Sequence, residues 1–505
     1  MRRERRFRRC HYQRTRRSRT LIGLPFLLLA CVLSCSRDNP QAVFDHAYNT
    51  LLHGDLKRAQ DEAHRECQRF RDNGEWAWKF RTLEARAVLQ QGHYQDALKL
   101  LKSAPLPSGQ PDLAGPILTL EGEADLEMHN FPEAERLLNN ATTLCASHTS
   151  MHCGYVFKAR GHLEAEENRW EPAERLYELT LAFARAHGDT SLESQALINL
   201  GNVSLTQERY DEAIDRSEAG YQAAKTVGAR RLELITQGNI GWAHYKLGDS
   251  DKALELFAES ENLASQLGDV WSRANELTNI GYIYMDQRKF DLAAQSFQQA
   301  LTLAQGIEAK KYIYNALRVL ARLSLQTGDL ANASQYAQRA VEIARQDGNH
   351  LDELYPMLVQ GQIAARRGEL TAAENTFHEV ERDKLCPVFL KWEAEHSLAR
   401  LHEDEKHADS ADREYRSALA TFEAARDTVR HQDSQLSFLT NASHIYDDYV
   451  HFLVAQGKTG DALRWADYSR ARTLAEGLGL LAKGGSAGPP LARDRKSTRL
   501  NSSHT

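Results

Sequence analysis

Three stretches of the chain decide its fold. They read INLGNVSLTQERYDEAIDRSEAG (198–220), GNIGWAHYKLGDSDKALELFAES (238–260) and TNIGYIYMDQRKFDLAAQSFQQA (278–300), and each starts forty residues after the one before. Small residues recur with this step in two registers, at Gly161, Gly201, Gly241, Gly281, Ala321 and Gly361, and at Ala173, Ala213, Ala253, Ala293, Ala333 and Ala373. A fixed period of this length is typical of a repeat protein.

Each unit contains two segments with helical periodicity, for example 196–207 and 210–227, separated by the polar pair Glu208-Arg209. Recurrent turn residues agree with this division. Gly248, Gly328 and Gly368 follow the first segment, and Gly188, Gly228, Gly268 and Gly348 follow the second, where we expect left-handed helix caps. The unit is therefore predicted to be a helix hairpin.

The glycines of the first register lie inside predicted helices, where each costs about 1 kcal/mol relative to alanine. A compensating contact is therefore expected, and we interpret it as close crossing of the two helices of a hairpin. The alanines of the second register serve the same approach. Aromatic residues are expected to fill the space between successive hairpins, at Tyr177, Phe257, Phe297 and Phe377, with Ser217 and Ala337 as exceptions.

The three quoted stretches resemble the tetratricopeptide repeat (TPR) family, although its usual unit has 34 residues. The resemblance implies an all-α fold, a right-handed superhelical solenoid of helix hairpins. Looser units extend the array on both sides, around Gly54–Ala59, Gly92–Ala97, 122–134 and 399–418. We therefore predict a solenoid over residues 35–420, with its regular units near 150–385.

The first residues read as a secretory signal, because an Arg-rich stretch (1–20) precedes an uncharged apolar run (21–34). The run ends before Cys35 and resembles a bacterial lipoprotein signal, which implies a signal peptide of residues 1–34, lipidation of Cys35 and membrane attachment through that anchor. Cys31 is the second candidate. The alternatives are an ordinary signal peptide or a misassigned start. In each case the body is expected outside the cytoplasm, in the bacterial cell envelope.

Residues 421–483 are predicted to form further helices that resemble the junction between TPR arrays and a caspase-like domain of the CHAT family. Ser469-Arg470-Ala471-Arg472 carries this resemblance, which implies that the chain is the sensor half of a cysteine peptidase truncated before its catalytic domain. A Gly/Pro linker (484–493) follows. Residues 494–505 look like a translated sequencing adapter, with a natural polar tail as the alternative.

Charge and motif content argue against catalysis and nucleic acid. The formal charge of −6 understates the acidity of the body, because the first twenty residues are strongly basic, and phosphate binding needs a basic stripe. Gly484 to Gly488 match a hydrolase elbow but follow a predicted helix instead of a strand. No cofactor or metal motif is found. Cys145 and Cys153 flank a predicted loop, either as a disulfide or as buried free thiols.

Candidate binding residues lie on the predicted first helices, which line the concave face of a TPR solenoid. They fall in two phases around the small residue, namely Asn199, Asn239 and Asn279, and Asn202, Trp242, Tyr282, Arg322 and Gln362. In related solenoids an asparagine ladder clamps the backbone of an extended peptide, since a carboxamide both donates and accepts. The alternative is that these asparagines cap or bridge neighbouring helices.

The sequence thus favours a scaffold that binds a protein or peptide, without catalytic residues of its own. The alternatives are a truncated CHAT-family peptidase, a structural assembly protein of the cell envelope, and a cytoplasmic peptide-sensing regulator. The last lacks a visible DNA-binding helix-turn-helix.

Overall fold

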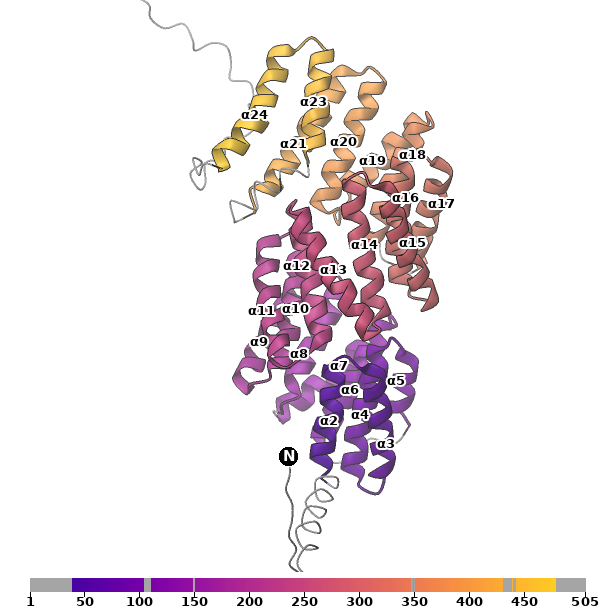
Figure 1. The fold of residues 1–505 in the computed structure, drawn as a ribbon, viewed down its shortest axis with the longest axis vertical. Helices are drawn as coiled ribbons and strands as arrows, with labels where there is room; N and C mark the ends of the chain where they lie inside the picture. The colour runs from indigo at the N-terminus through magenta and orange to yellow at the C-terminus, as the bar shows by residue number, and fades with distance from the viewer. Residues whose placement is uncertain are drawn as a thin grey trace, which may run out of the picture. The chain divides into compact units, whose positions relative to one another are not determined.

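The computed structural model describes residues 39–103, 110–148, 150–346, 348, 350–429, 438 and 442–477, and these are helical throughout apart from short connections (Figure 1). The predicted signal peptide with Cys35, the linker 484–493 and the tail 494–505 lie outside the described residues. The chain divides into two compact units, with α2 to α6 in the first and α7 to α24 in the second. No helix among the described residues is long and apolar enough to span a membrane.

The first unit contains the looser upstream repeats. Its helices are α2 (Pro40–Leu52), α3 (Leu56–Arg69), α4 (Gly74–Gln90), α5 (Tyr94–Leu101) and α6 (Pro111–Glu127). Small residues of consecutive helices form its core, with Ala47 of α2, Ala59 of α3 and Ala87 of α4 in one buried cluster. The predicted degenerate units around Gly54–Ala59 and Gly92–Ala97 are thus hairpins as well.

The second unit is a run of helix hairpins. Its helices are α7 (Phe131–Ser147), α8 (Cys153–Glu166), α9 (Trp170–His187), α10 (Thr190–Thr206), α11 (Tyr210–Thr226), α12 (Arg230–Lys246), α13 (Ser250–Leu267), α14 (Val270–Asp286), α15 (Phe290–Gly306), α16 (Lys310–Gln326), α17 (Leu330–Gln346), α18 (His350–Arg366), α19 (Leu370–Arg382), α20 (Val388–Asp404), α21 (Ala408–Arg426), α23 (Ser443–Ala455) and α24 (Thr459–Gly477). The predicted all-α array of hairpins is confirmed.

Turns and caps repeat in phase as the sequence predicts. Gly248 between α12 and α13 has φ +89°, and Gly268 after α13 has φ +67°, values that favour glycine because it lacks a Cβ. The carboxylates of Asp249 and Asp269 then accept hydrogen bonds from the backbone N–H groups of Lys252 and Ser272. Such N-caps satisfy amides that have no partner within the helix.

The glycines inside the first helices make room for an aromatic ring sixteen residues later. A Cβ added at Gly281 would lie 2.5 Å from Cδ1 of Phe297, closer than real side chains approach. Gly161, Gly241 and Gly361 stand in the same relation to Tyr177, Phe257 and Phe377. The ring also reaches the next hairpin, since Phe257 of α13 packs with Ile280 and Ile283 of α14. The compensating contact expected from the sequence is therefore glycine against ring.

Two units depart from the pattern, one at both positions and one at the ring position alone. Ala321 stands where other units have glycine, and its partner sixteen residues later is Ala337 instead of an aromatic residue; both are fully buried in one cluster. Gly201 likewise faces the small Ser217, whose Oγ would lie 2.7 Å from an added Cβ. In the unit with Ala321, the larger residue on one helix is thus accompanied by a smaller one on its partner, as close packing requires.

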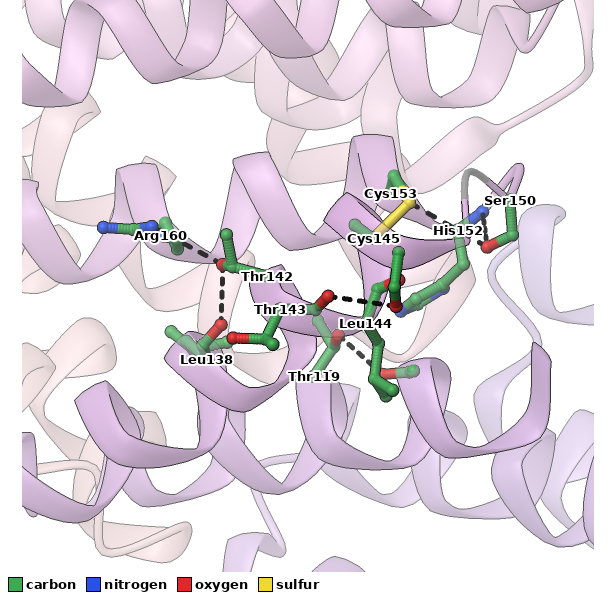
Figure 2. The surroundings of a disulfide bond; sticks show 12 residues. Thr119, Leu138, Thr142, Thr143, Leu144, Cys145, Ser150, His152, Cys153 and Arg160 are labelled. Atoms are coloured by element: carbon green, nitrogen blue, oxygen red, sulfur yellow. Dashed lines mark hydrogen bonds between the residues drawn. A yellow bond between two sulfur atoms is a disulfide. The ribbon is translucent and has the colours of Figure 1, made fainter. Parts of the chain in front are cut away.

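A disulfide joins α7 to the start of α8. Cys145 and Cys153 are bonded, with their Cα atoms 5.7 Å apart, and Figure 2 shows the bond beside the short connection that carries Ser150 and His152. In this connection the backbone N–H of His152 donates to Ser150 Oγ. Of the two alternatives left by the sequence, the structure has the disulfide. It links α7 covalently to α8.

Changing both Cys145 and Cys153 to serine is expected to lower the free energy of unfolding by about 2–3 kcal/mol, the loop-closure entropy for a ring of this size. Denaturant titration with and without dithiothreitol measures the effect. The wild type under reductant should match the double variant. The control is Cys386→Ser, which changes a free thiol, and its stability should still fall in the presence of reductant as that of the wild type does. Equal stability of wild type and double variant without reductant would contradict the expectation.

Candidate functional site

The first helices of successive hairpins form a layer of their own. Helix α10 contacts α12, which contacts α14, and the series continues through α16 and α18 to α20. We call one side of this layer the inner face, defined by the mostly half-buried residues Trp242, Tyr245, Lys246, Tyr282, Asp286, Arg318, Arg322, Tyr355 and Phe389. The predicted binding residues all lie on these helices.

Two of the three predicted ladder asparagines bond to the preceding first helix. Asn239 of α12 donates from Nδ2 to Oδ1 of Asn202 on α10 at 2.7 Å, and Nδ2 of Asn199 lies 2.9 Å from Nε2 of His162 on α8. These contacts bridge neighbouring repeats. Because a carboxamide has two donor hydrogens and an acceptor oxygen, each keeps capacity for a further bond. The peptide clamp stays a prediction.

The third asparagine is placed differently. Asn279 is only 7% exposed, and its Nδ2 donates to Glu276 Oε2 at 3.2 Å within α14. Glu276 itself is buried against α12, where a Cβ added at Gly238 would lie 2.6 Å from Oε1. Burial raises the pKa of Glu276 to about 7, although the hydrogen bonds from Asn279 and Asn275 act in the opposite direction. The third asparagine is therefore hydrogen-bonded to a buried acid of its own helix.

The predicted aromatic positions come together. The ring of Trp242 lies 5.2 Å from that of Tyr245 and 5.8 Å from that of Tyr282, measured between centroids. The hydroxyl of Tyr245 donates to Asp286 Oδ2 at 2.9 Å, which connects α12 to α14. Gln362, farther along, donates from Nε2 to Ser397 Oγ at 3.1 Å and links α18 to α20. The inner face thus has an aromatic centre with polar links between repeats.

Two arginines of α16 lie one helical turn apart beside this centre. The guanidinium of Arg318 lies 4.6 Å from the ring centroid of Tyr355 and about 6 Å from those of Tyr282 and Tyr314. Its Nε is buried and has no hydrogen-bond partner. The predicted Arg322 interacts electrostatically with Asp286 and Glu393. The face therefore presents a partly unsatisfied cation within a ring of tyrosines.

Helix α20 meets the same region. The ammonium of Lys246 lies 4.1 Å from the ring centroid of Phe389, a cation–π contact, and the carboxylate of Glu208 accepts a hydrogen bond from the backbone N–H of Phe389. Burial lowers the pKa of Lys246 to about 8, while the charge of Glu208 opposes this shift. Lys246 is thus charged at neutral pH, and this charge is lost above about pH 8.

Sequence analysis missed Arg318, Tyr245, Lys246 and Asp286. A signal existed, because Lys246, Asp286 and Arg318 each lie four residues from a predicted position, and residues four apart share a helix face. No such spacing in the sequence indicated Tyr355 or Phe389, because these two residues reach the site only through contacts between helices.

Comparisons with known proteins agree with this architecture. Residues 228–468 match the family model of the MalT-like TPR region. The chain is 23% identical over 266 residues to human outer dynein arm-docking complex subunit 4, covering 53% of this chain and 36% of that protein. It is 26% identical over 230 residues to the regulatory protein AfsR of Streptomyces griseus, covering 45% and 22%. The chain thus spans about a third or less of these relatives.

Among solved structures, a Rap protein complexed with Competence and Sporulation Factor superposes with a TM-score of 0.55. The match covers 73% of this chain and 99% of that one at 14% identity, so it shows a shared fold. Together with the glycine–aromatic repeat and the layer of first helices, these matches identify the chain as a helical repeat protein, of which residues 228–468 resemble the MalT-like tetratricopeptide region.

Proposed function

We propose that this protein is a non-catalytic TPR scaffold that binds a protein or peptide ligand on the inner face, and that the ligand contributes a carboxylate to Arg318. The state of Arg318 carries the proposal. A buried donor without a partner costs about 1–3 kcal/mol, and more when the group is charged. A bound carboxylate would remove this cost through charge-assisted hydrogen bonds, and guanidinium geometry suits that partner.

The surroundings of Arg318 support the same ligand class. Tyrosine rings supply contact area with little conformational entropy to lose. Arg322 and Lys246 add positive charge nearby. The Rap protein that shares this fold was crystallised with Competence and Sporulation Factor, and this supports ligand binding as the role of the array.

The test uses a library of random heptapeptides with free C-termini and the same library with amidated C-termini. Purified protein is incubated with each, and retained peptides are identified by mass spectrometry. We expect retention from the free-acid library, and an at least tenfold loss of affinity for a retained peptide in Arg318→Gln, since hydrogen bonds to charged groups contribute about 1.5–3 kcal/mol. If amidated peptides are retained as well and all of them contain Asp or Glu, the carboxylate that binds Arg318 belongs to a side chain of the peptide.

The matched control is Arg339→Gln, at an exposed arginine of α17 on the outer layer of helices, which should bind as wild type. The proposal would be wrong if the wild type retained no peptide, or if Arg318→Gln bound a retained peptide with the affinity of the wild type. Replacing Asn199, Asn239 and Asn279 together by alanine tests the clamp in the same selection. Unchanged affinity at unchanged helicity would exclude it.

The location proposed is the extracytoplasmic side of a bacterial membrane, with attachment through Cys35. The signal-like residues 1–34 support it, and so does the disulfide between Cys145 and Cys153, because disulfides persist mainly in oxidising compartments. The relation to CHAT-family peptidases rests on the resemblance of residues 437–481, which contain α23, the break at Gly457 and α24. It stays a proposal.

A further inference from the structure

We propose that helices α20 and α23 form a divalent-metal site, with Glu393, His396 and His444 as ligands and zinc as the metal that suits them best. The ligand atoms of these three residues all lie within 4.8 Å of one another. They come from segments about fifty residues apart, so no local metal motif announces them. The proposal is independent of the peptide ligand.

Helical spacing explains why these side chains converge. Glu393 and His396 are three residues apart on α20 and therefore share one face. His444 lies in the first turn of α23, and its Nε2 is 3.3 Å from Glu393 Oε1. The rings of His396 and His444 meet edge to face with centroids 5.1 Å apart. Two helices thus present three ligand groups to one point.

One of the distances between ligand atoms already fits a tetrahedral ion, and the others are at most 4.8 Å. Zinc binds imidazole nitrogen and carboxylate oxygen at about 2.0–2.2 Å, which places neighbouring ligand atoms of a tetrahedron roughly 3.3–3.6 Å apart. The pair of His444 Nε2 and Glu393 Oε1 already has this separation. Two imidazoles and one carboxylate form the ligand set of many zinc sites that leave a fourth position for water or substrate.

A fourth residue orients the site. His396 Nε2 lies 3.0 Å from Asp448 Oδ2, and Asp448 is four residues after His444 on the same face of α23. A carboxylate that accepts from the second ring nitrogen fixes the tautomer and orientation of a metal-binding histidine. Arg400 lies 3.0 Å from the same Asp448 oxygen and balances its charge. We therefore assign Asp448 a positioning role.

Positive charge near the site lowers its expected affinity for a divalent metal ion. Arg322 acts on Glu393 from α16, and Arg400 lies beside Asp448. Both repel a divalent cation. We accordingly expect weaker binding than at a closed structural zinc site with four ligands. Occupancy would tie α23 to α20 and so hold the last hairpin against the array.

Cobalt(II) chloride titration of the full chain tests the proposal, because tetrahedral cobalt has intense visible absorption and octahedral cobalt does not. Zinc chloride titration by calorimetry gives the stoichiometry. We expect one ion per chain and a loss of at least tenfold in affinity for His396→Ala and for His444→Ala. Glu393→Gln, which keeps the side-chain shape, should also lose the visible band. Asp448→Asn should weaken binding about ten- to hundredfold.

A second group, His402, Glu405 and His407, lies at the end of α20 and serves as the internal control. His407→Ala should bind cobalt as wild type. Loss of binding in His407→Ala with retention in His396→Ala would move the ion to the second group and overturn the proposal. The proposal would also be overturned if the wild type showed no tetrahedral cobalt spectrum. The same holds if folded His396→Ala and Glu393→Gln both gave the spectrum of the wild type. Circular dichroism verifies that each variant is folded.

Discussion

Replacing Phe297 by alanine is expected to lower the free energy of unfolding by about 3–5 kcal/mol, and adding Gly281→Ala is expected to recover part of this loss. Phe297 is fully buried, so its removal leaves a cavity. Gly281→Ala alone should also destabilise, by about 1–3 kcal/mol, because its Cβ would meet the ring and the enclosed ring has no room to move. In the double variant the new methyl group enters the emptied space.

The neighbouring repeat supplies the precedent for this compensation. Ala321 and Ala337 occupy the equivalent positions forty residues later, and both are fully buried. Denaturant titration of the four proteins gives the coupling energy of a double-mutant cycle, which we expect to favour the double variant by about 1–3 kcal/mol. Gly306→Ala is the control, since a Cβ there meets nothing within 4 Å. Additive losses would show that the glycine and the ring do not share space.

The second large effect is expected at Glu276. Its pKa is about 7 in the folded chain, whereas an exposed glutamate has a pKa of about 4.5. At pH values between 4.5 and 7, the carboxyl group of Glu276 is protonated in the native state and ionised in the unfolded chain. The stability contributed by the neutral acid is therefore fully present below pH 4.5 and is lost as the pH rises through 7, by about 3 kcal/mol in total.

Glu276→Gln should remove this pH dependence, because glutamine is neutral at every pH and nearly the same size. At pH 8 the variant is expected to be more stable than wild type by about 2–3 kcal/mol, and at pH 4.5 the two should be similar. Denaturant titration across this range measures it, with hydrogen exchange of the α14 amides as a local readout. Glu171→Gln, at an exposed residue of α9, should match wild type at each pH. A pH-independent difference between Glu276→Gln and wild type would refute the assignment.

Much of the local structure followed from the sequence. The hairpins, their turns at Gly248 and Gly328, and the caps at Gly188 and Gly268 lie where the periodicity placed them, because each depends on neighbours within a few residues. The small residue at position 281 and its equivalents were expected to let the two helices cross closely, and the structure shows that the space they leave is filled by an aromatic ring of the second helix. Their partners were identified only in part, since the sequence does not say which helix each ring faces.

The candidate site was less predictable. Trp242, Tyr282 and Arg322 were placed on the inner face by their register, and the structure brings them together. The sequence could not show that Asn279 is buried beside an acid, or that Arg318 lacks a partner at Nε. Both facts depend on which side chain of the next repeat comes closest.

The sequence alone determined that this protein is an array of helix hairpins with a forty-residue step, since helical periodicity, turn glycines and small residues act over short distances. Only the tertiary structure decided the disulfide between Cys145 and Cys153, the pairing of each glycine with its ring, and the meeting of Glu393 and His396 with His444. The physical reason is that these contacts join residues on different helices. Their distances depend on how the helices pack, and helical periodicity carries no information about that packing.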